Sequence, residues 1–94
     1  MSKYGIRLTT QFKKDVRLAE KSHKDIGLLR DVVKKLANGE KLDKRFKDHA
    51  LAGNWKNYRE CHLQPDWLLV YRYEKNLLIL TLARTGKHSE ILGK

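Results

Sequence analysis

The run from Leu77 to Ala83 constrains the fold more than any other part of the chain, because it is almost entirely apolar on both faces of an extended strand. Such a strand lies in the interior of a sheet and is covered by helices on at least one side. The sequence therefore predicts a layered domain in which this strand, extended to Arg84, is a central element.

Three other segments have the character of strands. Residues from Tyr4 to Leu8 alternate in polarity with a period of two, and residues from Trp55 to His62 and from Trp67 to Tyr73 precede the apolar run. Short links at 64–66 and 74–76 are compatible with hairpins. The C-terminal half therefore predicts a three-stranded antiparallel meander.

Two amphipathic helices are expected between the first strand and the meander. The first follows a capping residue, Thr9 or Thr10, and the second ends before Gly39, which suits a left-handed conformation. Apolar residues recur at helical spacing at Phe12, Val16 and Ala19, and again at Ile26, Leu29, Val33 and Leu36. A short turn between the helices predicts an antiparallel hairpin. The order predicts an α+β fold, with residues 1–94 forming a single domain.

The charge of the chain favours a polyanionic partner. It has 21 Lys and Arg residues against 11 Asp and Glu residues, a formal net charge of +10. Nucleic acid, an acidic protein, or both in turn would balance this charge. The single cysteine, Cys61, excludes an internal disulfide and a cysteine-based zinc cluster, and it fits a reducing cytoplasm. The sequence shows no signal peptide and no apolar run long enough to span a membrane, so we expect a cytoplasmic protein.

Histidines in the C-terminal half are the main candidates for chemistry. A meander would bring several polar or aromatic side chains to one edge of the sheet: His62, Asp66, Trp67, Arg84 and His88. The position of His49, in the long loop before the meander, is not fixed by this argument. Imidazole can give or take a proton near neutral pH, and arginine can hold a phosphate. These are the parts needed to cut RNA without a metal, so we expect no metal and no cofactor. A metal site made only of histidines is a weaker alternative, since no motif such as HExxH occurs.

The region from Phe46 to Tyr71 resembles the YafQ-type branch of the RelE/ParE toxin superfamily. Two motifs carry the resemblance, Asp48-His49-x-Leu51-x-Gly53-x-Trp55 and His62-x-x-Pro65-Asp66-Trp67-x-Leu69-x-Tyr71, and the segment from Arg84 to Gly93 is similar too. The resemblance implies a RelE-like, microbial ribonuclease-like sandwich. It also implies the toxin of a bacterial type II toxin–antitoxin module, a ribosome-dependent endoribonuclease that cleaves mRNA in the A site.

The resemblance assigns roles to particular residues. It places His49, His62, Asp66 and His88 in an acid/base group, Arg84 on a phosphate, and Trp67 as an active-site aromatic, although Trp67 also suits a core position. Lys87 is a further candidate for phosphate binding. Leu92 stands where the family often has phenylalanine.

The expected reaction is attack of the RNA 2′-OH on the adjacent phosphorus. His88 is the first choice for the acid that protonates the leaving 5′-oxygen. Asp66 or His49 is the candidate base, and His62 is expected to position the reacting groups.

Expected partners are the ribosome, mRNA and an antitoxin with an acidic, disordered segment; no membrane is expected. Two alternatives remain open. A ParE-like gyrase inhibitor would lack this histidine set, and a non-catalytic basic binding module would bind RNA or an acidic protein without cutting.

Overall fold

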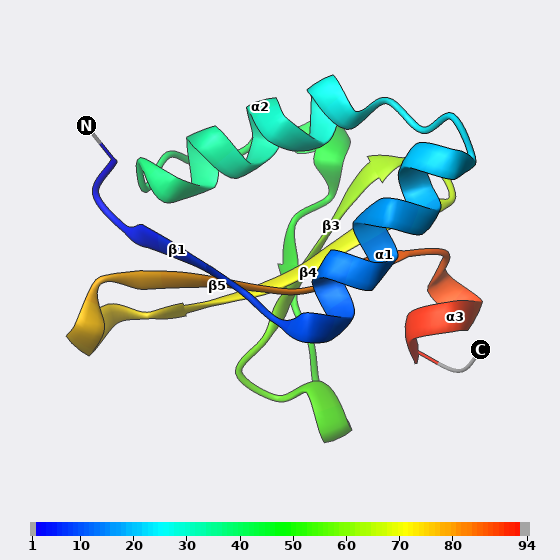
Figure 1. Cartoon of the computed structure of the whole chain (residues 1–94). Helices are drawn as coiled ribbons and strands as arrows, with labels where there is room; N and C mark the ends of the chain where they lie inside the picture. The colour runs from blue at the N-terminus through cyan, green and yellow to red at the C-terminus, as the bar shows by residue number, and fades with distance from the viewer. Residues whose placement is uncertain (1, 93–94) are drawn as a thin grey trace.

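The computed structural model describes residues 2–92 and has an α+β architecture built on one mixed sheet (Figure 1). The elements in chain order are β1 (Gly5–Leu8), α1 (Thr10–Lys21), α2 (Ile26–Ala37), β2 (His49–Ala50), β3 (Arg59–Gln64), β4 (Trp67–Glu74), β5 (Ile79–Gly86) and α3 (His88–Leu92). Three single-turn 3-10 helices lie at Lys44–Phe46, Gly53–Trp55 and Lys75–Leu77. None of the helices in this part of the chain is long and apolar enough to cross a membrane.

The predicted meander is confirmed and forms the centre of the sheet. β3, β4 and β5 pair antiparallel in that order, and β4 lies between the other two. β1 pairs with β5 in parallel, so the sheet is mixed, with the five strands in the order β1-β5-β4-β3-β2. The sequence did not predict β2, because a strand of two residues has too few positions to show a period.

Strand ends differ from the expectation at two places. Residues Gly53–Trp55 form a 3-10 turn, so the strand expected from Trp55 begins only at Arg59. Leu78 follows another 3-10 turn and adopts a left-handed conformation with a φ of 52°, so the strand expected from Leu77 begins at Ile79. In both places the 3-10 turn interrupts the extended conformation that apolar residues would otherwise favour.

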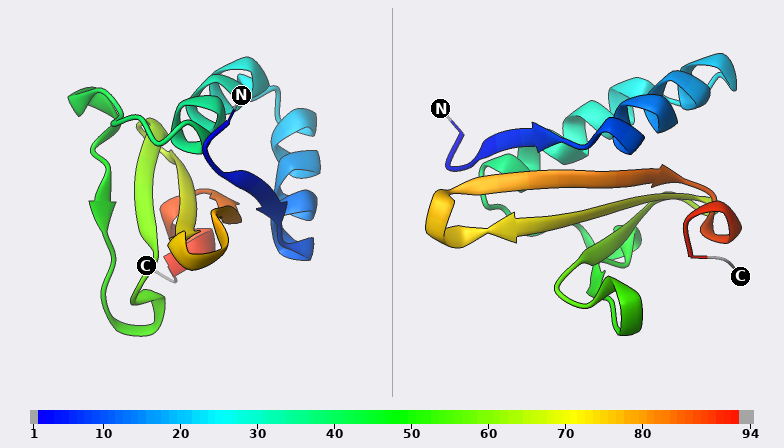
Figure 2. Two further views of the ribbon diagram at one scale, coloured as in Figure 1. Left: turned by 90° about the vertical axis from the view of Figure 1, so that its left-hand side faces the viewer. Right: turned by 60° about the horizontal axis from the view of Figure 1, so that its bottom comes forward.

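The helix signals in the sequence are confirmed. The Thr9 side chain accepts a hydrogen bond from the Phe12 amide, and the Asp25 side chain caps α2 through the Leu28 amide. Gly39 has a φ of 76°, as expected for the residue that ends the second helix. Figure 2 shows α1 and α2 on one side of the sheet and α3 on the other.

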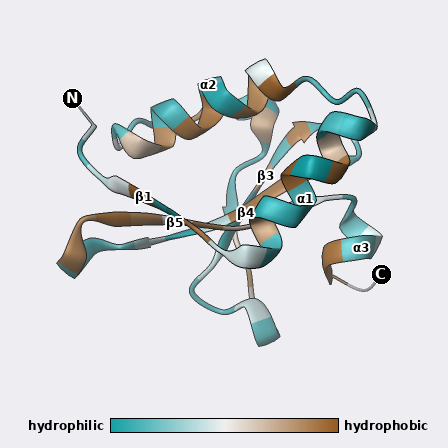
Figure 3. Cartoon of the chain, viewed as in Figure 1, coloured by the Kyte–Doolittle hydropathy of each residue, from teal (hydrophilic) through white to brown (hydrophobic). Residues whose placement is uncertain are grey.

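The sheet separates two apolar clusters of unequal size. The larger cluster packs under α1 and α2, and the smaller one, around Leu68, Val70, Ala83 and Ile91, lies on the face that carries α3. The apolar stretch of β5 expected in the sheet interior is visible in brown in Figure 3. Because side chains alternate along a strand, β3 contributes to both faces: Cys61 and Leu63 belong to the larger cluster, and Glu60 and His62 lie on the side of the smaller one.

Candidate active site

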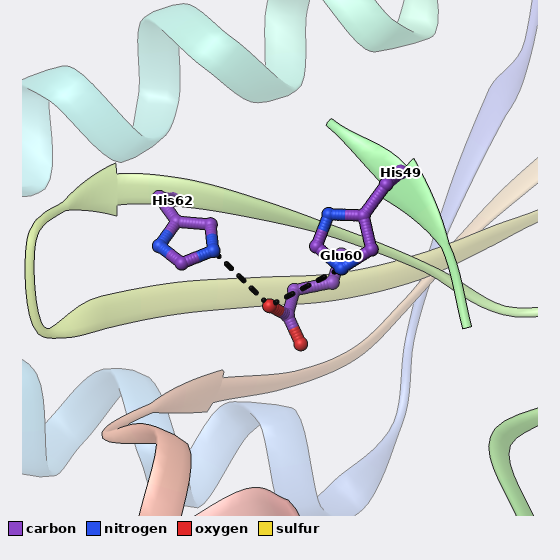
Figure 4. A group of neighbouring side chains, drawn as sticks. All are labelled: His49, Glu60 and His62. Carbon is purple, nitrogen blue, oxygen red and sulfur yellow. Dashed lines mark ion pairs between the residues drawn. The ribbon is translucent and has the colours of Figure 1, made fainter. Parts of the chain in front are cut away.

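A pair of histidines and a glutamate form a compact cluster on the face of the sheet away from α1 and α2. His49 of β2 pairs with Glu60 of β3, and His62 follows Glu60 by two residues, so all three side chains lie on the same face. Figure 4 shows the two imidazoles converging on the Glu60 carboxylate from neighbouring strands. The sheet register therefore fixes the position of His49, which the sequence alone left open.

The three side chains are within reach of one another. Nε2 of His62 lies 3.2 Å from Oε1 of Glu60, and Nε2 of His49 lies 3.7 Å from the same oxygen. The imidazole centroids are 6.2 Å apart. The side chain of Glu60 is only 3% exposed, whereas that of His49 is 49% exposed. The cluster therefore has a buried carboxylate at its base and an imidazole that opens to solvent.

A backbone contact selects the tautomer of His49. Its Nδ1 lies 2.7 Å from the carbonyl oxygen of Lys47, and a carbonyl oxygen can only accept, so Nδ1 carries the proton. In the neutral ring Nε2 then has a lone pair, and this atom faces Glu60. Such a nitrogen can accept a proton or bind a metal ion.

Glu60 is the residue of this cluster that sequence reasoning missed. Its Oε2 is buried and has no hydrogen-bond partner among residues 2–92. An unpartnered buried carboxylate oxygen is costly, and such atoms are retained where chemistry needs them. The available signal was the spacing of Glu60 and His62 by two residues in a strand, which places both on one face.

Asp48, immediately before His49, anchors the loop that carries it. Its carboxylate accepts hydrogen bonds from the Tyr71 hydroxyl at 2.5 Å and from Arg59 at 3.3 Å. Burial, together with the hydrogen bond to Asp48, raises the pKa of the Tyr71 phenol well above its usual range, so this hydroxyl remains a donor. The contacts tie the two-residue strand β2 to β3 and β4.

The sheet register brings the backbone of Arg84 into line with the cluster, and α3, which begins at His88, packs on the same face as the cluster. Arg84 pairs with Val70, which in turn pairs with Glu60, so the three form a row across neighbouring strands. Two strand spacings separate the ends of the row, about 10 Å. His62, Leu68 and Gly86 form the adjacent row, and His88 begins α3 two residues later.

Asp66 and Lys87 are exposed at the same end of the sheet. Asp66 lies in the turn between β3 and β4, and Lys87 lies between β5 and α3. Both side chains can therefore reach solvent or a ligand at that end. The amide of Lys87, just before α3, donates to the side chain of Glu90 within that helix.

The guanidinium of Arg84 is already engaged. Its Nε donates to Oδ2 of Asp15 at 2.8 Å, and its Nη2 donates to Oδ1 at 3.2 Å. Asp15 is buried in α1 and also accepts from the Thr85 amide. Arg84 therefore links β5 to α1, and a phosphate would have to share this cation with a carboxylate.

One residue expected near substrate, Trp67, lies in an apolar cluster instead. Trp67 is 1% exposed in the larger cluster, so its ring faces are not accessible for stacking on a base. Trp67 therefore occupies a core position, which was the other role that the sequence suggested for it. Leu92 packs half-buried against the smaller cluster.

Comparison with known proteins assigns the family. Residues 4–93 match the family described as "Bacterial toxin of type II toxin-antitoxin system, YafQ". The chain belongs to the YafQ family of toxins.

Relatives of known structure and name resemble the chain over its whole length. The mRNA interferase toxin YafQ of Escherichia coli strain K12 is 40% identical over 94 residues, which is 99% of this chain and 100% of that protein. The toxin in the E. coli DinJ–YafQ toxin–antitoxin complex superposes with a TM-score of 0.88 at 39% identity, covering 97% of this chain and 99% of that one. A metal-bound toxin from Helicobacter pylori superposes with a TM-score of 0.89 at 43% identity, covering 94% and 98%.

In this YafQ-family chain the same cluster also has the geometry of a metal site. One ligand atom each from His49, Glu60 and His62 lies within 4.8 Å of the others. Imidazole nitrogen and carboxylate oxygen are ligands of divalent transition metals, and the partnerless Oε2 of Glu60 suits such an ion. Sequence reasoning expected no metal, because it looked for spacing along the chain and these ligands meet across paired strands.

Proposed function

We propose that this chain is the toxin of a type II toxin–antitoxin module and a ribosome-dependent endoribonuclease that cleaves mRNA in the A site. The observation that carries the proposal is the open cluster of His49, Glu60 and His62, in which two imidazoles lie against one buried carboxylate. The mRNA interferase activity named for the E. coli relative supports it.

Cleavage proceeds by attack of the 2′-hydroxyl within the RNA. Nε2 of His49 takes the hydroxyl proton, the 2′-oxygen bonds to phosphorus, and the bond from phosphorus to the 5′-oxygen breaks. His88 gives its proton to that leaving oxygen, and the product is a 2′,3′-cyclic phosphate. The Glu60 carboxylate stabilises the imidazolium formed on His49, since it lies 3.7 Å from Nε2. No metal is needed in these steps.

His62 and Arg84 have supporting roles in this scheme. His62 contacts the same carboxylate oxygen and holds it in place between the rings. Arg84 offsets the charge that builds on the phosphate, a contribution whose loss typically costs about 10²–10³ in rate for one contact. Asp66, exposed in the hairpin turn, is the second candidate for the base.

The ribosome supplies the geometry that the domain lacks. The attack needs the 2′-oxygen, the phosphorus and the leaving oxygen in line, and a ribosome-held mRNA can be fixed in this arrangement. The +10 charge supplies attraction to the ribosome that weakens with salt. We therefore expect poor turnover on naked RNA.

A cleavage assay on translating ribosomes tests the activity. The wild-type toxin should cut A-site mRNA in the presence of EDTA, kept below the Mg²⁺ concentration that the ribosomes need, and leave a 2′,3′-cyclic phosphate. His88→Ala should lose cleavage and growth arrest while still folding and binding antitoxin. Full activity of a folded His88→Ala protein would contradict the assignment of the acid, and equal turnover on free RNA would contradict ribosome dependence.

Metal binding at the same cluster is a second candidate function. The partnerless Oε2 of Glu60 favours it, and the H. pylori relative is described as metal-bound. Calorimetric titration of the free toxin with Cu²⁺ or Zn²⁺ should show one site that is lost in His49→Ala. His23→Asn removes an exposed histidine of the inter-helix turn and is the matched control. Equal loss of binding in both variants would contradict the site.

The antitoxin segment that silences the toxin is proposed to be acidic, amphipathic and disordered before binding. A groove of about 530 Å³ between β1, α1 and α2 exposes Ile6 and Leu8, and its rim carries Lys13, Arg17 and Arg30. β1 is an edge strand, so its backbone is open to further pairing. A homologous toxin forms a complex with the antitoxin DinJ.

Apolar contact should dominate this complex, because exposed ion pairs contribute only about 0–1 kcal/mol each. The complex should persist in salt on the order of 0.5 M, well above the range in which exposed charges interact strongly. Ile6→Asp should weaken it more than Leu77→Asp, which changes an exposed leucine that does not line the groove. Release by moderate salt alone would contradict this description of the interface.

A further inference from the structure

A second cavity lies beside the cluster and is strongly cationic. It has a volume of about 740 Å³, within the range of ligand-binding clefts, and Tyr71 and Tyr73 lie among its lining residues. Its exposed cations, here called the lysine groove, are Lys3, Lys41, Lys44, Lys47 and Lys75. The groove follows the segment from residue 39 to residue 48, which runs from the end of α2 to β2 (Figure 1).

The positive charge of the lysine groove is not balanced internally. None of its lysines takes part in an ion pair among residues 2–92. Two of the three acidic residues of the groove are committed elsewhere: Asp48 is paired with Arg59, and Asp43 caps a 3-10 helix through the Arg45 amide. Unpaired cations this close together repel one another, so an anionic ligand would stabilise them.

The lysine groove shares one lining residue with a cavity at His62. Lys47 lines it and also lines a smaller cavity of about 360 Å³ that includes Arg45 and His62. The carbonyl of the same Lys47 accepts from His49. Arg59 at the start of β3 contributes to the groove and His62 near its end to the smaller cavity, so the two together extend along β3. An extended anion that passes from the groove over Lys47 would come to His62.

We propose that the lysine groove binds the phosphate backbone of single-stranded RNA and leads it to His49 and His62. This inference rests on the proposed endoribonuclease function and adds where the substrate strand lies. The chemistry fits backbone binding, because lysine acts as a point charge toward phosphate and carries no sequence preference. The tyrosines do not add base stacking, since Tyr71 is buried and the Tyr73 ring packs against the rings of Tyr4 and Tyr71. The groove therefore increases the affinity for RNA and sets the path of the strand, but it does not select a sequence.

Binding of a non-cleavable RNA separates this proposal from catalysis. The probe is a fluorescent 2′-O-methyl oligoribonucleotide, which cannot undergo 2′-hydroxyl attack, titrated with free toxin at several salt concentrations. The groove variant is Lys41→Ala/Lys44→Ala. The control is Lys14→Ala/Lys21→Ala, which removes two exposed lysines of α1 outside the groove. The control and the groove variant therefore have the same net charge.

The groove variant should bind more weakly and with a shallower salt dependence. Each phosphate contact to a single strand contributes about 0.7 to the slope of log K against log salt, so two lost contacts reduce the slope by about 1.4. If the affinities of the groove variant and the wild type converge near 1 M salt, this difference in slope corresponds to roughly 25-fold weaker RNA binding by the variant at 0.1 M salt. The control should change little, and both variants should keep the wild-type melting temperature.

Three outcomes would overturn the proposal. Equal weakening in the two variants would mean that RNA is attracted by overall charge. Unchanged RNA affinity in the groove variant would mean that the strand lies elsewhere. Unchanged RNA affinity with weakened binding of the antitoxin would assign the groove to an acidic protein segment. Failure of the proposed function would instead appear as absent cleavage on ribosomes by a toxin that still binds the probe through the groove.

Discussion

At the scale of single residues, Glu60 shows how a buried charge can be held ready for chemistry. Its carboxylate is buried, contacts two imidazoles through one oxygen and leaves the other without a partner in the described part of the chain. A glutamate kept only for stability would be expected to satisfy both oxygens. The buried carboxylate would stabilise an imidazole that becomes positively charged during a reaction. It offers no such gain to the protein at rest.

Replacing Glu60 with glutamine should separate these two roles. Glutamine keeps the shape but removes the buried charge, so the free energy of unfolding should stay within about 1 kcal/mol of wild type. Cleavage on ribosomes should fall about 10²-fold in kcat with little change in KM, because proton transfer loses its electrostatic support. Unaltered kcat together with a large loss of stability would show that Glu60 is structural.

Arg84 combines a structural contact with its expected role on a phosphate. Arg84→Ala should lower the melting temperature, because it leaves the buried Asp15 carboxylate without its cation, a loss of about 2–3 kcal/mol. It should also reduce cleavage. Asp15→Asn should lower stability while keeping cleavage, since the guanidinium remains and is less neutralised. Equal loss of cleavage in the two variants, after correction for unfolded protein, would show that Arg84 acts only through the fold.

At the scale of elements, β2 depends on contacts outside itself. Two residues of strand cannot hold His49 by pairing alone, and Asp48 supplies the anchor through Tyr71 and Arg59. Tyr71→Phe should lower the free energy of unfolding by about 1–3 kcal/mol, as for a hydrogen bond to a charged group. It should also reduce kcat by loosening His49.

A second tyrosine of β4 provides the matched control. Tyr73 donates its hydroxyl hydrogen bond to the Leu36 carbonyl at 2.7 Å and not to Asp48. Tyr73→Phe should lower stability by about 1 kcal/mol, the usual amount for a neutral pair, and leave kcat unchanged. A similar fall in kcat in both variants would contradict a specific role for the Asp48 anchor. Thermal melts and single-turnover cleavage on ribosomes make the comparison.

The elements that sequence could predict are those with a local signal. The capping Thr9 and the left-handed Gly39 marked helix ends, and alternating or wholly apolar runs marked the long strands. Pairing of β1 with β5 could not be predicted, because it joins residues more than seventy positions apart that carry no mark of their partner. The histidines of the cluster were recognised from the sequence, but Glu60 was not, since its role depends on the register of β2 against β3.

At the scale of the whole molecule, burial of weak acids in the core links stability to alkaline pH. Burial raises the pKa of the Cys61 thiol from about 9 to about 12, and burial likewise raises the pKa of the Tyr73 phenol from about 10 to about 12. The Tyr71 phenol is shifted in the same direction. In each case the folded protein favours the protonated, neutral form.

The sign of the resulting pH dependence follows from linkage. Below pH 9 these groups are protonated in both states, so their full contribution to stability is present. As pH rises from about 9 toward 12, the unfolded chain loses these protons first and is stabilised relative to the folded protein. The free energy of unfolding should therefore fall by a few kcal/mol over this interval.

Urea denaturation at pH 8 and pH 11, in a reducing buffer, measures the effect. Lysines also lose charge at high pH, which relieves repulsion within a chain of net charge +10 and opposes the fall. Cys61→Ala controls for this, because it keeps every lysine and removes only the buried thiol. The variant should be less stable than wild type at pH 8 through the small cavity it creates, yet lose less stability on going to pH 11. An equal fall in the free energy of unfolding in the two proteins would mean one of two things: the thiol stays neutral in the unfolded chain as well, or its burial does not oppose ionisation. In either case the proposed link between this core residue and alkaline unfolding would be wrong.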